Sequence, residues 1–418
     1  MAQLSDDCFA FGGELMRAEE ALRILADRIV CVVGTERVPL ARCGRRILAA
    51  DVIATRDVPP HDNAAVDGYA VAFDDLDPQG TTQLAVTGRL AAGGRLETPV
   101  RRGAAIRIFT GAPMPAGTDT VFMQEDARAV DGVVTLPHGI RRGANRRKRG
   151  EDITAGKTIL HAGARLRPQD LGLAASIGIT ALDMRRPLIV AVFSTGDELV
   201  EPGGPISIGK IYDANRVTLI ALIEQFGCTV IDLGIIPDRL DAVREALRTA
   251  SSVADAIVTS GGMSTGEEDH LRGAVGTLGA LHFWRLAIRP GRPVALGQVA
   301  GKPFVGLPGN PVAMMVTCLR FARPLLLGLA GATAREPIRF KVRTQAALEK
   351  KAGRREWLRV RIARDADGAP VALRFPRDGA GILSSLVESD GLLELPEELT
   401  TVPAGAMVDF LPFSEVDV

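Results

Sequence analysis

The stretch of sequence that decides the fold begins with LIVAVF (188–193), a continuous apolar run that ends in a glycine turn. The segments that follow are ANRVTLIALIEQFG (214–227), CTVIDL (228–233), DRLDAVREALRTA (238–250) and DAIVTS (255–260). The short apolar runs are typical of buried strands, and the longer segments have the spacing of helices. Strands that alternate with helices of about 12 residues predict a parallel sheet with right-handed crossovers. We therefore expect residues 187–331 to form a central parallel α/β domain.

The segments on either side of this domain show other patterns. Residues 57–156 contain short alternating runs such as QLAVTGRL (83–90), punctuated by Gly and Pro, which predicts a β-rich insert domain. Residues 1–56 and 157–186 both contain helical spacing, so we expect them to form one discontinuous linker domain of helix and strand. Residues 332–418 contain five short strand-like runs, which predicts a small C-terminal β-barrel or sandwich, of which we choose the barrel. The expected fold class is a multidomain protein of α/β and β units.

Composition excludes several classes of function. The 418 residues include 50 Lys and Arg against 50 Asp and Glu, and aromatic residues make up only 4%. Such a chain lacks the positive field and the stacking surfaces that hold nucleic acid or an anionic membrane. Five scattered cysteines form no CxxC pair, which argues against a disulfide framework or a zinc knuckle. The N-terminus lacks a signal-peptide pattern, and the apolar stretch 311–330 contains Arg320 and Arg323. We expect a cytoplasmic protein with neither nucleic acid nor a membrane as partner.

Glycine-containing segments follow several of the expected strands. They are FSTGDELV (193–200), GIIPD (234–238), TSGGMSTGEED (259–269) and GLPGNPV (306–312). Parallel α/β sheets bind ligands at the carboxyl ends of their strands, so we expect the ligand site at this edge. The small residues of 260–266 allow backbone N–H groups to approach an anion, which predicts a phosphate-binding loop.

Two other motifs in this region fit less well. Residues 262–266 match the GxSxG pattern of hydrolases, but the later histidines are only His270 and His282, and His270 follows almost at once. GPISIGK (204–210) matches the first part of a P-loop, but Ile211 stands where Ser or Thr would hold Mg²⁺. A serine hydrolase and a P-loop nucleotidase are therefore disfavoured.

Charged residues near these loops suit an oxyanion and a divalent cation. WRLAIRPGRP (284–293) spaces three arginines around a Pro-Gly turn, and guanidinium groups bind oxyanions through paired hydrogen bonds. Carboxylates at the strand ends are hard oxygen ligands of the kind that Mg²⁺ prefers. The basic run RRGANRRKRGED (141–152) is either a solvated surface or a group of cations that gathers phosphates, with Asp152 reaching a metal.

Taken together, these segments resemble one family, the bacterial molybdopterin molybdenumtransferases, or MoeA proteins. The resemblance rests on strings that run in the family's order along nearly the whole chain. They are DNAAVDGYAV (62–71), IRIFTGAPMPAGTDTV (106–121), RRKRGEDI (146–153), FSTGDEL (193–199), IYDANR (211–216), LGIIPD (233–238), TSGGMSTGEED (259–269), FWRLAIRPGRP (283–293) and GLPGNPV (306–312).

The resemblance implies a four-part subunit with an α/β three-layer domain of the molybdopterin-binding type. It further implies a homodimer, whose active cleft lies between the α/β domain of one subunit and the β-rich insert of the other. Proteins of this family take adenylylated molybdopterin and molybdate, release AMP with Mg²⁺, and leave molybdenum on the dithiolene. Molybdopterin adenylyltransferase and cofactor-accepting enzymes are possible docking partners.

The resemblance, together with the motif analysis, assigns residues to four groups. The catalytic group is Asp67, Asp152, Glu198, Asp238, Asp269 and Thr110. The group that binds the pterin and its phosphates is Ser194, Thr195, Gly196, Ser260, Gly261, Gly262, Ser264, Gly266, Pro308, Gly309 and Asn310. The molybdate group is Arg285, Arg289, Arg292, Pro293 and Arg359. The Mg²⁺ ligands are expected among Glu198, Asp238 and Asp269.

The chain departs from the family pattern at several of these segments. Arg285, Arg289 and Arg292 occupy a segment where the family often has Lys, and Ala313 follows GNPV where Ser is common. Ala380 lies in a stretch that often has Ser, and His61 replaces an aromatic residue. The loss of two hydroxyls keeps open a second hypothesis, a non-catalytic carrier or scaffold for the pterin. A third hypothesis is molybdopterin adenylyltransferase, whose fold resembles residues 187–330 alone.

Overall fold

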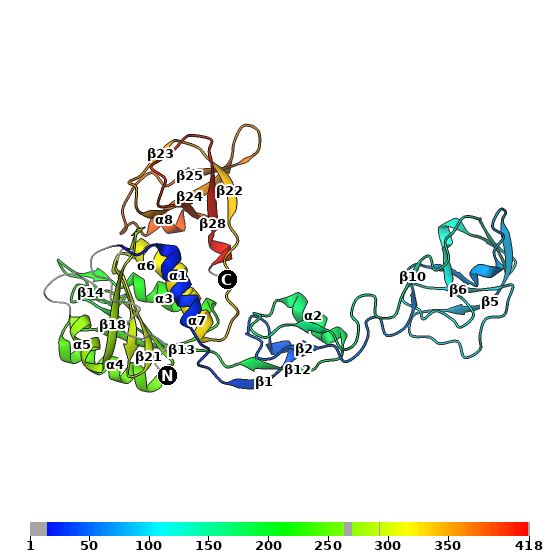
Figure 1. Cartoon of the computed structure of the whole chain (residues 1–418), viewed down its shortest axis with the longest axis horizontal. Helices are drawn as coiled ribbons and strands as arrows, with labels where there is room; N and C mark the ends of the chain where they lie inside the picture. The colour runs from blue at the N-terminus through cyan, green and yellow to red at the C-terminus, as the bar shows by residue number, and fades with distance from the viewer. Residues whose placement is uncertain (1–14, 263–269, 292, 417–418) are drawn as a thin grey trace.

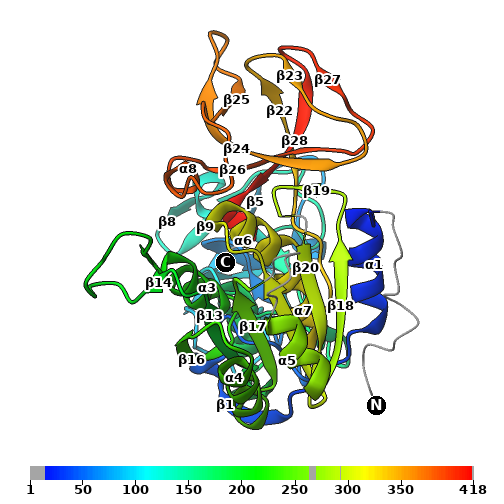
Figure 2. The ribbon, with the colours of Figure 1, turned by 90° about the vertical axis from the view of Figure 1, so that its left-hand side faces the viewer.

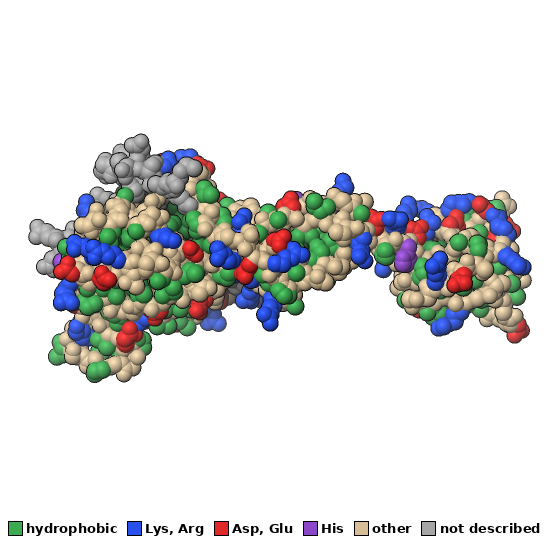
Figure 3. All heavy atoms as spheres, turned by 90° about the horizontal axis from the view of Figure 1, so that it is seen from below, with side chains coloured by type: hydrophobic (Ala, Val, Ile, Leu, Met, Phe, Trp, Pro, Cys, Tyr) green, Lys and Arg blue, Asp and Glu red, His purple; other side chains and the backbone are tan. Residues whose placement is uncertain are grey.

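The computed structural model describes residues 15–262, 270–291 and 293–416. The chain is elongated, with the α/β unit and the C-terminal barrel at one end and the β-rich insert at the other (Figure 1). The space-filling view shows a constriction between the two ends (Figure 3). The insert of one chain therefore lies far from that chain's own α/β sheet.

The α/β unit contains a six-stranded sheet in the order β16-β13-β17-β21-β20-β18. Its strands are β13 (Ile189–Thr195), β16 (Thr229–Ile236), β17 (Ala256–Ser260), β18 (Gly279–Arg285), β20 (Pro293–Val299) and β21 (Lys302–Leu307). The first four strands in this order are parallel, but β20 is antiparallel to both of its neighbours. The expected all-parallel sheet fails at β20 because a turn at Ala300 and Gly301 joins β20 directly to β21, and only antiparallel strands can be joined so tightly.

Helices cover both faces of this sheet and make it the middle of three layers. They are α3 (Ala214–Gln225), α4 (Leu240–Val253), α5 (His270–Leu278), α6 (Pro311–Thr317) and α7 (Arg323–Leu329). Val243 of α4 and Leu271 of α5 pack with Phe193 in one apolar cluster. Leu219 of α3 belongs to the cluster on the opposite face, together with side chains of α6 and α7. The three-layer architecture is the fold class expected from the sequence.

The helical run from Pro311 to Leu329 is long and apolar enough to cross a membrane by length and composition, but 72% of its most apolar window is buried inside the protein. It consists of α6, a π-helical turn (Cys318–Ala322) and α7. Asn310 occupies the N-cap position and Pro311 the first helical position, although the Asn310 side chain makes no capping hydrogen bond.

Two short strand pairs connect the ends of the molecule. β1 (Thr35–Pro39) pairs with β12 (Ala181–Arg185), and β2 (Val52–Ile53) pairs with β11 (Thr158–Leu160). Helix α2 (Pro168–Ser176) lies beside them, with Pro168 in its first turn. The N-terminal helix α1 (Ala18–Arg28), which we grouped with these pairs, packs instead against α7, because Ala18, Ala21 and Leu25 form its apolar face and join the α/β core.

The β-rich insert is built on a six-stranded sheet in the order β7-β4-β6-β5-β9-β8. Its strands are β4 (Gly68–Val71), β5 (Thr82–Leu90), β6 (Ala104–Ile108), β7 (Thr120–Met123), β8 (Arg128–Val130) and β9 (Val133–Leu136). A further pair, β3 (Asn63–Ala64) with β10 (Arg146–Arg147), lies beside this sheet.

The C-terminal unit is a closed barrel. Its sheet runs β24-β25-β22-β28-β26, and β24 pairs with β26 to close it. The strands are β22 (Phe340–Thr344), β24 (Arg355–Arg364), β25 (Pro370–Arg374), β26 (Gly391–Leu395) and β28 (Met407–Pro412), and the minor elements are β23 (Leu348–Glu349), β27 (Thr401–Val402) and α8 (Ser384–Val387). The five short strands predicted from the sequence are therefore confirmed. The barrel stands above the carboxyl ends of the α/β strands (Figure 2).

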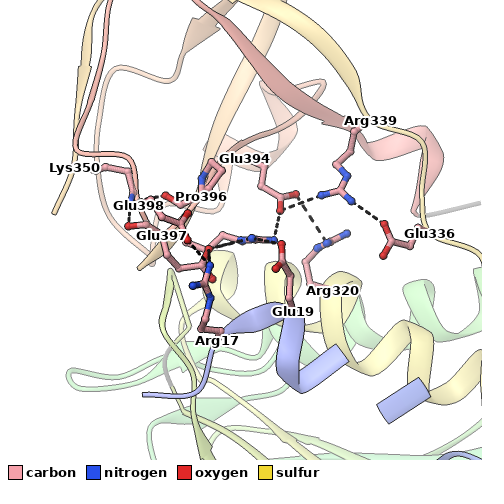
Figure 4. A network of polar contacts seen from close by, with 11 residues as sticks. Arg17, Glu19, Arg320, Glu336, Arg339, Lys350, Glu394, Pro396, Glu397 and Glu398 are labelled. Atoms are coloured by element: carbon pink, nitrogen blue, oxygen red, sulfur yellow. Dashed lines mark hydrogen bonds and ion pairs between the residues drawn. The ribbon is translucent and has the colours of Figure 1, made fainter. Parts of the chain in front are cut away.

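A network of charged side chains holds the barrel on the α/β unit (Figure 4). Arg355 of β24 binds Glu394 of β26 at 2.9 Å and Glu19 of α1 at 2.6 Å. Arg320 of the π-helical turn lies 3.9 Å from the same Glu394, and Arg339 lies 3.4 Å from it. Because this network joins α1, the helical layer and the barrel, it sets how the two units face each other.

Candidate functional site

The carboxyl edge of the α/β sheet brings together the loops that the sequence singled out. Ser194 lies opposite Ser260 in the register of β13 and β17, and Ser260 lies opposite Leu307 of β21. Gly261 and Gly262 have φ angles of +90° and +64°, which only glycine adopts readily, and a Cβ on either would overlap Thr195. The loop can therefore pass this close to β13 only with glycine at both positions.

Three hydroxyls are buried at this edge without a hydrogen-bond partner among the described residues: those of Ser194, Thr195 and Thr259. A buried polar atom that lacks a partner carries a desolvation cost unless a ligand or water satisfies it. These hydroxyls are thus available to a polar ligand at the end of the sheet. Ser194 and Thr195 were predicted as pterin-binding residues, whereas Thr259 was not.

Asn215 ties two of the glycine loops together. Its side-chain amide donates to the Ser260 hydroxyl at 2.8 Å and to the Gly309 carbonyl at 2.7 Å. Asp213 caps the same helix by accepting from the Arg216 backbone N–H at 3.1 Å. Asn215 lies in the quoted IYDANR segment. Ser260 and Gly309 are far from it along the chain, so no local sequence pattern predicts these two hydrogen bonds.

The proposed metal ligands are partly within the described residues. Glu198 follows β13 and Asp238 follows β16, which are neighbouring parallel strands. The Asp238 backbone N–H donates to the Asp197 carboxylate at 3.2 Å, so Asp197 links the two loops. No group of three or more metal-binding side chains occurs within residues 15–262, 270–291 and 293–416. Asp269, Ser264, Gly266 and Arg292 lie outside the described residues.

A cavity of about 450 Å³ lies between the α/β unit and the barrel. Its α/β wall includes Arg289 and the segment Pro308–Asn310, and its barrel wall includes Arg359. The structure therefore brings together predicted residues from two different groups, one for pterin and one for molybdate. The lining also contains Arg354, Glu356, Arg374, Asp378, Ala313 and Ala380.

A backbone pairing joins the α/β unit to the barrel beside this cavity. The short strand β19 (Ile288–Arg289) leaves the α/β unit and pairs in parallel with β24, which places Arg289 opposite Glu356. An ion pair of 3.4 Å joins these two side chains, and Arg289 is also 3.8 Å from Asp378. Of the other predicted arginines, Arg285 ends β18 with its backbone opposite Pro293.

Arg359 is the buried cation of the cavity, with 8% of its surface exposed. Its terminal nitrogens donate to the carbonyls of Gly379 at 3.3 Å and Arg377 at 3.1 Å. Its Nε is buried and has no hydrogen-bond partner within the part of the chain that the structure describes. Burial lowers the pKa of this guanidinium because its charge is poorly compensated. An anion in the cavity would supply the missing compensation.

A second predicted pair lies at the other end of the molecule, on the insert. The carboxylate of Asp67 accepts from the backbone N–H and from the hydroxyl of Thr110, each at 2.8 Å. These two bonds hold the pKa of Asp67 below its usual value, the backbone bond being the stronger cause. Gly68 beside it packs so tightly on Phe122 that a Cβ would overlap the Phe122 carbonyl. Asp152 is exposed, and its backbone N–H donates to the Val58 carbonyl at 3.0 Å.

Comparison with known proteins identifies the family to which these domains belong. Three family models match in order: the MoeA N-terminal region (domain I and II) over residues 16–178, a probable molybdopterin binding domain over 191–328, and the MoeA C-terminal region (domain IV) over 341–413.

Similar proteins cover nearly the whole chain. A molybdopterin molybdenumtransferase of Haemophilus influenzae is 37% identical over 96% of this chain and 100% of its own. Molybdopterin molybdenumtransferase 2 of Mycobacterium tuberculosis is 33% identical over 89% and 93%. The crystal structure of a molybdopterin biosynthesis moeA protein from Pyrococcus horikoshii matches with a TM-score of 0.82 at 29% identity, over 96% of this chain and 100% of that one. The chain therefore belongs to the molybdopterin molybdenumtransferase family, transferases of molybdenum cofactor biosynthesis.

Proposed function

We propose that this chain transfers molybdenum from molybdate to adenylylated molybdopterin and releases AMP in a Mg²⁺-dependent reaction. The observation that carries the proposal is the arginine-lined cavity, whose α/β wall, Pro308–Asn310, is also tied to the glycine loop through Asn215. The cavity suits a tetrahedral dianion, and the loops beside it suit a pterin phosphate. One continuous site would thus hold both substrates next to each other.

The residues act by binding and orientation. Arg289 and Arg359 hold molybdate through charge-assisted hydrogen bonds. Arg285 and Arg292 of the same segment would add further guanidinium groups, whereas Pro293, which has no N–H, would only fix the course of the backbone. The glycine loops 194–196 and 260–266 carry the pterin phosphates. Bound there, the dithiolene sulfurs face the oxoanion, and the phosphoanhydride to AMP lies over the strand ends. No protein nucleophile is needed.

The donor set at the strand ends fits a hard divalent cation. Glu198 and Asp238, with Asp269, would hold Mg²⁺ through carboxylate oxygens on adjacent loops. A divalent cation held by these carboxylates would supply positive charge to the phosphoanhydride. The role of the carboxylates would be to position the ion.

We further propose that the working unit is a cytoplasmic homodimer of four-domain subunits. The insert lies too far from its own α/β sheet to reach it (Figure 1). A second copy would instead supply Asp67 and Thr110, and with them Asp152, to the cleft. Domain boundaries at residues 57, 157, 187 and 332 divide the chain into the parts that this arrangement requires.

The proposal is tested with purified protein, adenylylated molybdopterin, molybdate and Mg²⁺, measuring AMP release and pterin-bound molybdenum. We expect Arg359→Ala to raise the molybdate concentration needed for half-maximal AMP release by about ten- to a hundredfold, since a charge-assisted hydrogen bond is lost. Arg361→Ala, two residues along β24 and exposed, is the matched control and should leave this concentration unchanged.

The alternative activities give different results in the same assay. Formation of adenylylated molybdopterin from ATP without molybdate would instead identify an adenylyltransferase. Tight pterin binding without AMP release, in the intact protein with Mg²⁺ and molybdate present, would identify a carrier.

A further inference from the structure

Asp378 lies in the loop after β25 and carries a negative charge into a cavity built for anions. Its carboxylate is 2.5 Å from Arg374 and 3.8 Å from Arg289. Both arginines line the cavity, as does Asp378 itself. The guanidinium groups that bind this carboxylate are the same hydrogen-bond donors that an oxoanion would use. Asp378 therefore competes for the guanidinium groups that the proposed function assigns to molybdate.

The second carboxylate of the cavity, Glu356, serves as a contrast. Its side chain is only 4% exposed and lies on the central barrel strand β24, opposite Arg289. The Asp378 side chain is 54% exposed, and its partners Arg289 and Arg374 are 53% and 38% exposed. Glu356 is thus fixed by the barrel, whereas Asp378 can turn into solvent without leaving a buried charge behind.

The loop that carries Asp378 also holds the buried arginine of the cavity. Arg359 donates to the carbonyls of Arg377 and Gly379, the residues on either side of Asp378. These bonds use the backbone and do not involve the Asp378 carboxylate. The side chain can therefore move while the loop and Arg359 stay in place. The hydrogen bond from Arg374, and then the positive charges of Arg374, Arg289 and Arg359, lower the pKa of Asp378, so the carboxylate is ionised at neutral pH.

From this geometry we infer that the Asp378 carboxylate is a built-in counter-ion. It pairs with Arg374 and Arg289 while the site is empty, and it rotates into solvent when a tetrahedral oxoanion binds. The inference rests on the proposed function, because it takes the cavity as the molybdate site. Asp378 thus sets the affinity of the cavity in this account. Every anion must replace its two ion pairs, so weakly binding anions do not occupy the site.

Calorimetric titration of the full-length protein with two tetrahedral oxoanions tests this. Molybdate carries two negative charges and perrhenate carries one, at closely similar size. We expect Asp378→Asn to bind both anions more tightly, by the same factor of about three- to tenfold. In this variant neither anion has to displace a carboxylate from the two arginines. Asp367→Asn, an exposed aspartate in the adjoining β24–β25 turn, is the matched control and should change neither affinity.

The other outcomes would overturn the inference in distinguishable ways. If the carboxylate stayed beside the bound anion, it would repel a dianion twice as strongly as a monoanion, and the factor for molybdate would be the square of that for perrhenate. Unchanged or weaker binding by Asp378→Asn, with measurable binding by the unmodified protein, would remove the counter-ion role alone. Binding of neither anion by either protein would overturn the proposed molybdate site as well.

Discussion

Two hydrogen bonds from one residue hold the carboxylate of Asp67, and both come from Thr110, 43 positions later in the chain. They stabilise the ionised form, so the folded-state pKa lies below the unfolded value of about 3.9. A carboxyl of this kind contributes stability above its unfolded pKa and loses that contribution as the pH falls through its folded pKa. Asp67 is therefore a fixed negative charge at neutral pH and cannot act as a proton donor there.

We expect Thr110→Val to raise the pKa of Asp67 toward its ordinary value without reaching it, because the backbone N–H remains as a donor. Carboxyl-carbon NMR titration of Asp67 measures this shift. Thr118→Val is the matched control, since the Thr118 hydroxyl donates to the Pro115 carbonyl and no carboxylate is involved. An Asp67 pKa that did not move in Thr110→Val would show that the hydroxyl bond is absent in solution.

At the level of secondary-structure elements, the barrel's place on the α/β unit depends on charges that are almost completely buried. Glu394 of β26 and Arg355 of β24 are 3% and 5% exposed, and Arg320 of the π-helical turn is 7% exposed. Burial alone would lower the pKa of Arg355, but its hydrogen bond to Glu19 and the charges of Glu394 and Glu397 raise it. Removing Glu394 takes this ion pair from the buried Arg320, while Arg355 keeps Glu397 at 3.0 Å, and a buried charge that loses a partner is destabilising.

We expect Glu394→Gln to lower the free energy of unfolding of the barrel by about 3 kcal/mol, because it leaves Arg355 and Arg320 without their shared partner. Urea unfolding followed by tryptophan fluorescence measures the change, since Trp357 is buried in β24. Asp409→Asn removes a half-buried barrel carboxylate, paired with the exposed Lys341, and should cost at most about 1 kcal/mol. Equal effects of the two substitutions would contradict a structural role for the buried network.

For the whole molecule, the separation of the insert from the arginine-lined cavity is the observation behind the proposed homodimer. Asp67 and Thr110 lie in the insert at one end, and Arg289 and Arg359 lie at the other (Figure 1). If both sets serve one reaction, they must come from different copies. Each dimer would then contain two composite sites.

This arrangement predicts complementation between two inactive variants. At a molybdate concentration that just saturates the unmodified protein, Asp67→Ala and Arg359→Ala should each release little AMP. A mixture refolded together should recover part of the release, because a hybrid dimer has one site with both residues intact. Refolding each variant with itself is the control. If differential tags showed that the mixture contained hybrid dimers but its AMP release did not recover, the composite site would be contradicted.

Local chemistry in the sequence was enough to locate the glycine loops and the barrel strands. Strand and helix periods, turn residues and caps act over a few neighbouring residues, so they can be read without knowing the fold. The same reasoning did not predict that β20 is antiparallel, because a two-residue turn joins it directly to β21. It also did not place α1, because the apolar face of that helix could have packed against any unit.

The sequence alone thus established which segments form the loops and which arginines and carboxylates are candidates for the site. Only the tertiary structure decided that Arg289 meets Glu356, 67 residues away, and that Arg374 and Asp378 join them. Those contacts depend on β19 pairing with β24, and through it on how two separately folded units pack. Packing of this kind is a property of complementary surfaces distributed over the whole chain, and no local pattern records it.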